Sequence, residues 1–321
     1  MSANHWDQVW KPLDDSKREF RVFVLDPSGD LLEPPRGRLE IVSRDTPPQY
    51  DAISYAWGQA GYVRPVYLDN VRRTVTATLE TCIRHLRHPD RERRLWCDAI
   101  CINQYDMAEK IGQVRIMQYI FADAVSVCVW LDSGSQKMKN VMQIIRQVGS
   151  ADVELSKVKI HGKPFTAENC HDLAIFISDP WWSRLWVMQE VALAKQVSFH
   201  HGQNSVAYEE LVQFKKSLKK SKAFMRVQEI RHKPLTSYEY DIDKLNTKLN
   251  ELKNLRLTFP HLEFDGHLIT LTNWHKDRLF EALVVSRTRL VTDPRDRVFG
   301  MLGCKTSLTH SHQLPDCPHQ A

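Results

Sequence analysis

Runs of apolar residues mark the first part of the chain as a series of strands. Residues 19–26 alternate well enough for a strand, and a turn signal at residues 27–30 precedes a second strand near residues 37–42. This pattern predicts an N-terminal β-hairpin. A short apolar strand is expected at residues 50–55, and Asp69-Asn70 stands between two further strand-like segments, which predicts a second hairpin.

Buried strands and a helix follow in the middle of the chain. Residues 95–102 form a nearly continuous apolar run interrupted by Asp98, which predicts a strand buried on both faces, and residues 124–131 predict another. Between them, Asp106-x-x-Glu109 is a capping-box pattern that opens a segment of helical periodicity. Strand, helix and strand at this spacing predict a βαβ unit, so we expect an α/β fold built on a parallel sheet flanked by helices.

Helical spacing of apolar residues predicts further helices around the sheet. They fall at residues 76–86, 138–148, 166–177, 183–194, 208–218, 279–290 and 292–303. A short strand is expected at residues 197–200, and residues 219–265 mix charge with few aromatic anchors, which indicates a helical or mobile insertion. We expect an extension at 1–18, a core domain at 19–214, a helical part at 215–303 and a polar tail at 304–321.

Composition places the chain among globular proteins. Of its 321 residues, 42% are hydrophobic and 26% are charged. No apolar run approaches the ~20 residues that a membrane span needs, and residues 1–15 lack the basic start and apolar core of a signal peptide. We therefore expect a cytoplasmic protein without a membrane partner. The net charge of +5 is mild and the lysines within residues 215–222 fit a solvated helix face, so nucleic-acid binding is not expected.

Cysteine usage and motif content narrow the chemistry. The seven cysteines lie mostly inside apolar runs, which predicts buried reduced thiols. Cys97 and Cys101 have no second pair of His or Cys residues at zinc-site spacing, so we expect no metal. G-x-G-x-x-G, G-x-x-x-x-G-K-[ST], H-E-x-x-H and G-x-S-x-G are all absent from the sequence. Dinucleotide-redox, P-loop, zincin and serine-hydrolase functions therefore have no support.

Three tryptophan-containing segments place polar residues at the edges of apolar runs, at residues 50–58, 95–104 and 181–190. Asp98 interrupts a buried strand where open α/β sheets place ligand groups, although a carboxylate that caps the next turn is an alternative. Asn103 follows in the loop and could serve only to stabilise that turn. Trp57 could stack on a flat ring or belong to the core, while Gly58 permits a ligand or a loop to come close.

Glu190 carries the sharpest hypothesis. It stands one helical turn after Trp186 in a mostly apolar segment, where an isolated carboxylate costs free energy. One interpretation is a structural salt bridge with Arg184 or Lys195. The other is catalysis, because acid–base and cation-stabilising chemistry uses carboxylates in partly apolar surroundings. Sequence spacing leaves both open. For Glu190, Asp98 and Trp57 we expect convergence at the carboxyl edge of the sheet.

Taken together, the three segments resemble the fungal heterokaryon-incompatibility (HET) domain, because they occur in that family's order. The resemblance covers roughly residues 19–202, with a continuation at 293–303. The HET family is in turn similar to Toll/interleukin-1 receptor (TIR) domains. Residues 50–55, 95–98 and 126–131 then correspond to the first three TIR strands, which implies a TIR-like, flavodoxin-like parallel sheet with an N-terminal β-hairpin and helical insertions.

The resemblance also implies a site. NAD-cleaving TIR domains carry a tryptophan and, four residues later, the catalytic glutamate, a spacing that matches Trp186 and Glu190. Glu190 is therefore the expected catalytic residue. The expected substrate-binding residues are Ser54, Tyr55, Trp57, Gly58, Asp98, Asn103, Arg184 and Trp186.

The implied function is hydrolysis of NAD to nicotinamide and ADP-ribose products by an assembled effector of heterokaryon incompatibility and regulated cell death. NAD is then a substrate, and no cofactor is expected. The expected protein partners are further copies of the chain and an upstream activating receptor or an allelic incompatibility partner. The alternative is a non-enzymatic, self-associating signalling or adaptor module in non-self recognition.

Overall fold

The computed structural model describes residues 9–58, 61–131, 136–151, 159–160, 162–164, 176, 179–220, 247–248 and 250. The helices predicted at 166–177, 279–290 and 292–303 and the insertion predicted at 219–265 lie almost entirely outside these residues. The proposed domain boundaries stay predictions.

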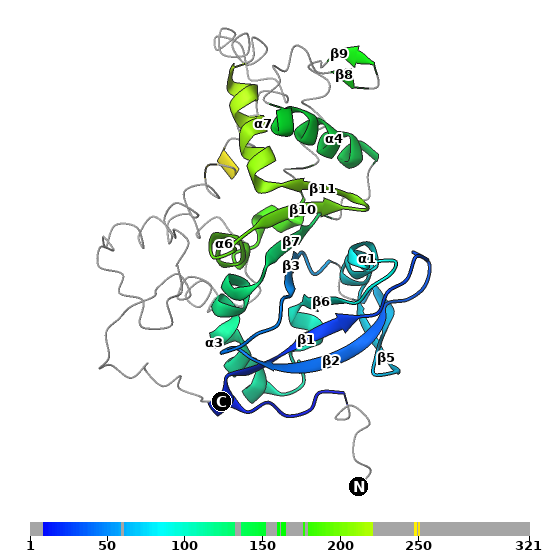
Figure 1. The fold of residues 1–321 in the computed structure, drawn as a ribbon, viewed down its shortest axis with the longest axis vertical. Coiled ribbons are helices and arrows are strands. Elements are labelled where there is room, and N and C mark those ends of the chain that lie inside the picture. Colours follow the sequence, from blue (N-terminus) through cyan, green and yellow to red (C-terminus); the bar gives the residue numbers. More distant parts are fainter. Residues whose placement is uncertain are drawn as a thin grey trace, which may run out of the picture.

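A nine-stranded mixed sheet forms the centre of the described structure (Figure 1). Its strands are β1 (Glu19–Leu25), β2 (Arg36–Ser43), β3 (Asp51–Tyr55), β4 (Val63–Leu68), β5 (Val71–Thr76), β6 (Arg93–Trp96), β7 (Ser126–Trp130), β10 (Val197–His201) and β11 (Asn204–Ala207). Their order is β11-β10-β7-β3-β6-β1-β2-β4-β5. A separate two-stranded sheet contains β8 (Lys159–Ile160) and β9 (Lys163–Pro164).

The predicted α/β fold with flanking helices is confirmed, but a purely parallel sheet is wrong. Strands β10, β7, β3 and β6 form one run of parallel pairs, and β2 also pairs parallel with β4, while the other pairs of this sheet are antiparallel. The predicted N-terminal hairpin exists, since β1 pairs antiparallel with β2, yet β1 also pairs antiparallel with β6 and joins the hairpin to the main sheet. Every residue of β1 after Glu19 is buried, as expected for an interior strand with covered faces.

The second predicted hairpin is confirmed as β4 and β5, which pair antiparallel. Asp69 and Asn70 connect them with φ angles of 51° and 64°. Two consecutive residues with positive φ are typical of the tight turns whose twist matches that of the flanking strands, and Asp and Asn tolerate this conformation better than most residues.

The strand predicted at residues 95–102 is wrong beyond its first residues. β6 ends at Trp96, and a short helix, α2 (Asp98–Cys101), follows. The Asp98 carboxylate accepts a hydrogen bond from the amide of Ala99 at 2.8 Å and so stabilises the first turn. A short apolar run has the same pattern in a buried helix as in a buried strand, so only the three-dimensional packing distinguishes them.

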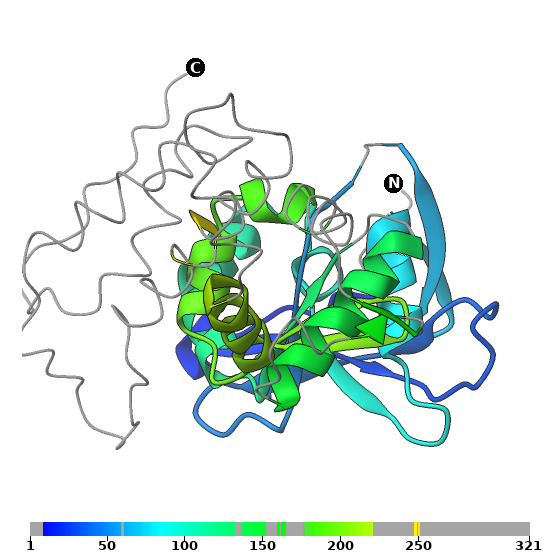
Figure 2. The same cartoon turned by 90° about the horizontal axis from the view of Figure 1, so that it is seen from above.

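Helices cover the sheet on two sides and pack beyond its β11 edge. They are η1 (Asp15–Lys17), α1 (Ala77–Leu86), α3 (Met107–Asp123), α4 (Gln136–Ala151), η3 (Pro180–Ser183), α6 (Val187–Ala192) and α7 (Tyr208–Lys220). Figure 1 shows α1 on one side of the central strands, α3 and α6 on the other, and α4 and α7 beside β11; Figure 2 shows the same arrangement from above. Among the described helices, none is long and apolar enough to cross a membrane.

The predicted helix at 183–194 is shorter and interrupted. η3 ends at Ser183, Arg184 is extended, and α6 begins at Val187. The helices predicted at 76–86, 138–148 and 208–218 are confirmed as α1, α4 and α7, because their apolar periodicity is long and regular.

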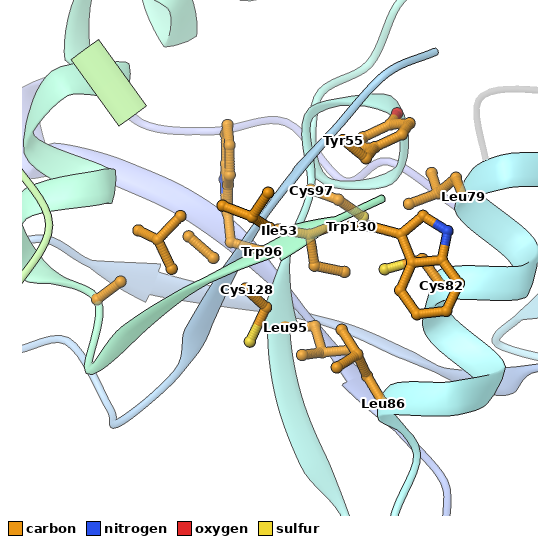
Figure 3. Packing of buried hydrophobic residues seen from close by; sticks show 14 of the residues in the cluster. Ile53, Tyr55, Leu79, Cys82, Leu86, Leu95, Trp96, Cys97, Cys128 and Trp130 are labelled. Atoms are coloured by element: carbon orange, nitrogen blue, oxygen red, sulfur yellow. The ribbon is translucent and has the colours of Figure 1, made fainter. Parts of the chain in front are cut away.

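The main core lies between the central strands and their covering helices. Figure 3 shows the ring of Trp130 from β7 beside Leu79 and Cys82 of α1. The cysteines within the described residues, Cys82, Cys97, Cys101 and Cys128, are buried free thiols, as predicted. Burial raises the pKa of the Cys128 thiol to about 11, which keeps it protonated and unreactive at neutral pH.

A buried ion pair joins β1 to α3. The predicted capping box is confirmed in one half, since Asp106 Oδ1 accepts from the amide of Glu109 at 3.1 Å. The Glu109 carboxylate binds Arg21 instead, through Nη1 at 2.6 Å and Nη2 at 2.9 Å. Arg21 Nη1 also donates to the carbonyl of Cys101 at 3.2 Å, so this guanidinium holds the end of α2 as well.

Replacing Glu109 by Met should lower the free energy of unfolding by about 3–5 kcal/mol, because it leaves a fully buried guanidinium without its anion. Urea unfolding measures the change. Asp45→Asn is the control: its 3.3 Å ion pair with Arg18 is more than half exposed on both sides, so the loss should stay below about 1 kcal/mol. Equal losses in the two variants would contradict the structural role of the Arg21–Glu109 pair.

Two helical glycines should respond in opposite ways to alanine. A Cβ on Gly149 of α4 would lie 2.3 Å from the backbone oxygen of Glu210 in α7, so Gly149→Ala should destabilise by about 1–3 kcal/mol. A Cβ on Gly112 of α3 finds its nearest neighbour, Asp15 Oδ1, at 3.8 Å, so Gly112→Ala should stabilise the helix by about 0.5–1 kcal/mol. Thermal unfolding of both variants checks the signs, and stabilisation by Gly149→Ala would refute the close α4–α7 packing.

Candidate functional site

The candidate site lies where the neighbouring parallel strands β3 and β6 end. Ser54 and Tyr55 are the last residues of β3, and Asp98 begins the turn directly after β6. Carboxyl ends of parallel strands meet at one edge of a sheet, which is where open α/β sheets place ligand groups. Glu190 lies in α6, 136 residues after Ser54 in the sequence, and its side chain reaches Ser54 at this edge.

Glu190 is held by a chain of two hydrogen bonds. The hydroxyl of Ser54 donates to Glu190 Oε2, and the indole N–H of Trp181 donates to Ser54 Oγ at 2.7 Å. The three side chains are buried, with 4% of Glu190 exposed. The Glu190 amide also donates to the carbonyl of Trp186 at 3.1 Å, which starts α6 one turn before the carboxylate, as predicted from the spacing.

Burial is the largest influence on Glu190 and raises the pKa of its carboxyl. The guanidinium of Arg184 and the Ser54 hydroxyl lower this pKa, while the negative charge of Asp98 raises it. Because the folded pKa lies above the unfolded value, this group favours folding at pH values below the unfolded pKa, and that contribution is lost as the pH rises through the folded pKa. Ionised Glu190 is thus present at neutral pH only at a cost to stability.

The basic residues considered as salt-bridge partners of Glu190 make their hydrogen bonds elsewhere. Arg184 Nη1 donates to the carbonyl of Tyr55, and Lys195 Nζ donates to the carbonyl of Asp123 at 2.9 Å. Arg184 therefore acts on Glu190 through its charge while it ties the η3–α6 connection to the end of β3. The side-chain hydrogen bond of the Glu190 carboxylate comes instead from the hydroxyl of Ser54.

Asp98 connects the first and second tryptophan segments. Its Oδ1 accepts from the hydroxyl of Tyr55 at 3.0 Å, and its Oδ2 accepts from the indole N–H of Trp57 at 3.1 Å. Burial, followed by the charge of Asp98, raises the pKa of the Tyr55 hydroxyl, which therefore stays a proton donor. Trp57 is 45% exposed, so its ring is held at the indole N–H and is partly open to solvent.

Gly58 and Asn103 serve the backbone around this cluster. Gly58 has a φ of +76°, and a Cβ there would lie 2.8 Å from Thr78 Oγ1, so both conformation and space require glycine. Asn103 Oδ1 accepts from the backbone amide of Tyr105 at 3.1 Å, and the backbone amide of Asn103 donates to Glu109 Oε1 at 2.7 Å. These contacts are those of a turn-stabilising residue and do not bring Asn103 to Glu190.

Trp181 is the member of the cluster that sequence reasoning missed. Its hydrogen-bond partner lies 127 residues earlier in the chain, and a local sequence pattern does not predict such a contact. The only available signal was general: a buried tryptophan usually finds an acceptor for its N–H. Glu190 binds Ser54, whereas Asp98 binds Tyr55 and Trp57. Ser54 and Tyr55 are consecutive residues of β3, and successive side chains of a strand point to opposite faces of the sheet. The convergence of Glu190, Asp98 and Trp57 therefore stays a prediction, as do the roles assigned to these residues.

The cluster offers two carboxylates, one guanidinium, a neutral tyrosine hydroxyl and an exposed indole ring. A buried carboxylate can stabilise a neighbouring positive charge or accept hydrogen bonds from hydroxyl groups, and its effect is larger in surroundings of low polarity. Within the part of the chain that the structure describes, no three His, Cys, Asp or Glu side chains lie close enough together to hold a metal ion.

Comparison with known proteins covers the part of the chain that contains these residues. Residues 50–190 match the protein family described as "Heterokaryon incompatibility protein (HET)", a range that begins before Ser54 and ends at Glu190. The chain is 26% identical over 338 residues to "Heterokaryon incompatibility protein 6, OR allele" of Neurospora crassa, a match that covers 91% of this chain and 48% of that protein. The chain thus spans about half the length of this curated relative.

No solved structure matches the chain, so the finer TIR-like assignment stays a prediction. The family match contains all the residues that form the Glu190 cluster, and the curated relative bears the same family description in its name. The chain therefore contains a region, residues 50–190, that matches the HET family.

Proposed function

We propose that this protein hydrolyses NAD to nicotinamide and ADP-ribose products through Glu190, as an effector of heterokaryon incompatibility and regulated cell death. One observation carries the proposal. The Glu190 carboxylate is buried at the carboxyl edge of the parallel strands, hydrogen-bonded by Ser54, and close enough to Asp98 and Arg184 for their charges to act on it. Such perturbed carboxylates are concentrated at functional sites.

The chemistry of NAD suits a single carboxylate. When the glycosidic bond breaks, its electron pair goes to the pyridinium ring, so nicotinamide leaves as a neutral molecule without a general acid. The ribose becomes oxocarbenium-like, water then bonds to its anomeric carbon, and the water proton is released. Ordinary glycosides need a second carboxyl group for the leaving oxygen. Glu190 would stabilise the cationic ribose, and its burial strengthens that attraction.

Neighbouring residues have supporting roles in this proposal. The exposed ring of Trp57 can stack on a flat ring of the substrate, while its bond to Asp98 fixes its orientation. Arg184 lowers the pKa of Glu190 and so favours the ionised form that the reaction needs. Activity should accordingly rise with pH through the folded pKa of Glu190.

The second candidate function is a non-enzymatic, self-associating signalling module. The observation that favours it is the low exposure of Glu190, because a carboxylate bonded to Ser54 and 4% exposed can serve solely to tie α6 to β3. Exposed large apolar side chains at the start of α3, Tyr105, Met107 and Ile111, support contact with another molecule in either function. The proposed protein partners are a second copy of the chain and an activating receptor or allelic partner.

Glu190→Gln separates the two functions. If the carboxylate stabilises a cationic transition state, the amide keeps the shape but loses the charge, so NAD cleavage should fall about 100-fold or more. Glu80→Gln is the matched control, because Glu80 is equally buried but pairs with Arg84 at 2.8 Å, away from the cluster. That variant should lose stability and retain wild-type NAD cleavage per folded molecule.

Both variants should be assayed for NAD cleavage and for thermal unfolding on the same samples. Wild-type turnover in folded Glu190→Gln protein would reject Glu190 as the catalytic group. A wild-type protein that cleaves no NAD, alone or assembled at high concentration, would favour the non-enzymatic module.

A further inference from the structure

The side chain of Trp181 has a contact that general core packing does not require. Trp181 lies in η3 and is fully buried, and its ring packs edge-on against Trp182 and Phe199. Its indole N–H nevertheless points at one polar atom, Ser54 Oγ, at 2.7 Å. That oxygen is the atom whose proton is donated to Glu190 Oε2.

The number of available protons fixes which group donates in each of these two hydrogen bonds. An indole N–H is a donor only, and a serine hydroxyl has one proton and two lone pairs. With the Trp181 N–H directed at one lone pair of Ser54 Oγ, the Ser54 proton is free to point at Glu190 and has its acceptor there. A proton on Glu190 Oε2 would face that same Ser54 proton, so one of the two would lose its acceptor inside the protein.

We propose that Trp181 is a positioning residue for Glu190: by donating to Ser54 it directs the serine proton onto Oε2, which favours the ionised carboxylate and leaves Oε1 to face the substrate. The catalytic consequence rests on the proposed function. The electrostatic consequence does not, because it concerns the protonation of Glu190 in the protein without substrate.

Other charged groups around Glu190 define the background against which Trp181 acts. Arg184, in the connection before α6, lowers the pKa of Glu190, and Asp98, at the start of α2, raises it, while burial is the largest influence and raises it. The Ser54 hydrogen bond lowers the pKa. If the indole N–H is removed, the Ser54 hydroxyl can rotate away from Oε2, so part of this lowering is lost and the pKa of Glu190 should rise.

The chain offers a matched control in the next residue. Trp182 lies in the same short helix, is equally buried, and donates its indole N–H to the carbonyl of Phe176 at 2.7 Å. Trp181→Phe and Trp182→Phe each replace a buried indole by a phenyl ring and each remove one buried N–H donor. Only Trp181→Phe removes the donor to Ser54.

The test measures the ionisation of Glu190 in wild type, Trp181→Phe and Trp182→Phe. Infrared difference spectra over a pH titration report the carboxyl and carboxylate bands, and Glu190→Gln assigns them. Trp181→Phe should shift the Glu190 titration to higher pH by about half a unit to one unit, the size expected for the loss of part of one hydrogen bond. The acid limb of the pH profile of kcat/KM for NAD cleavage should move by the same amount. Trp182→Phe should leave both unchanged.

An unshifted Glu190 titration in Trp181→Phe, or an equal shift in Trp182→Phe, would overturn the positioning role. Ser54→Ala serves as a second variant if Trp181→Phe fails to fold, and it should shift the titration at least as far, because it removes the donor itself. An unshifted titration in Ser54→Ala would equally overturn the proposal. Absence of NAD cleavage by wild type would reject the proposed function, while the infrared titration would still decide the role of Trp181.

Discussion

The structure depends on satisfying one buried carboxylate. Glu190 and Ser54 are 136 residues apart in sequence, and their hydrogen bond joins α6 to the end of a central strand. A buried carboxylate without partners costs several kcal/mol, so this contact restricts how the third tryptophan segment can pack on the sheet. Trp181 completes the restriction, because its N–H reaches the same serine. The residues that fix the fold at this edge are thus also those available for chemistry.

Local patterns predicted those elements whose signal is long or chemically specific. The hairpin turn at Asp69-Asn70, the periodic helix α1, the capped helix α3 and the buried strand β7 have such signals, and all are present. The strand expected at 95–102 failed because burial on all sides erases the difference between strand and helix periodicity. β11 was not predicted, since its short polar sequence shows no alternation, and the mixed sheet depends on long-range pairing of β1 with β6 that no local pattern contains.

The sequence indicated where the candidate site lies but not which hydrogen bonds connect its residues. The three tryptophan segments predicted that Asp98, Trp57 and Glu190 converge, and in the structure Glu190 binds Ser54 while Asp98 binds the next residue, Tyr55. Partners within the network came only from the structure, because hydrogen bonds between distant segments depend on the orientation of single side chains. An ion pair was one of the two interpretations that spacing left open for Glu190, whereas the hydrogen-bond partner in the structure is a neutral hydroxyl.

The central claim is that the Glu190 carboxylate acts on the ribose of NAD. The most direct measurement is a crystal structure of the protein with a carbocyclic NAD analogue, in which carbon replaces the ribose ring oxygen and the glycosidic bond resists cleavage. The account predicts ribose hydroxyls of the analogue within hydrogen-bond distance of Glu190, beside the ring of Trp57. An analogue bound elsewhere, with Glu190 buried and bonded only to Ser54, would contradict it.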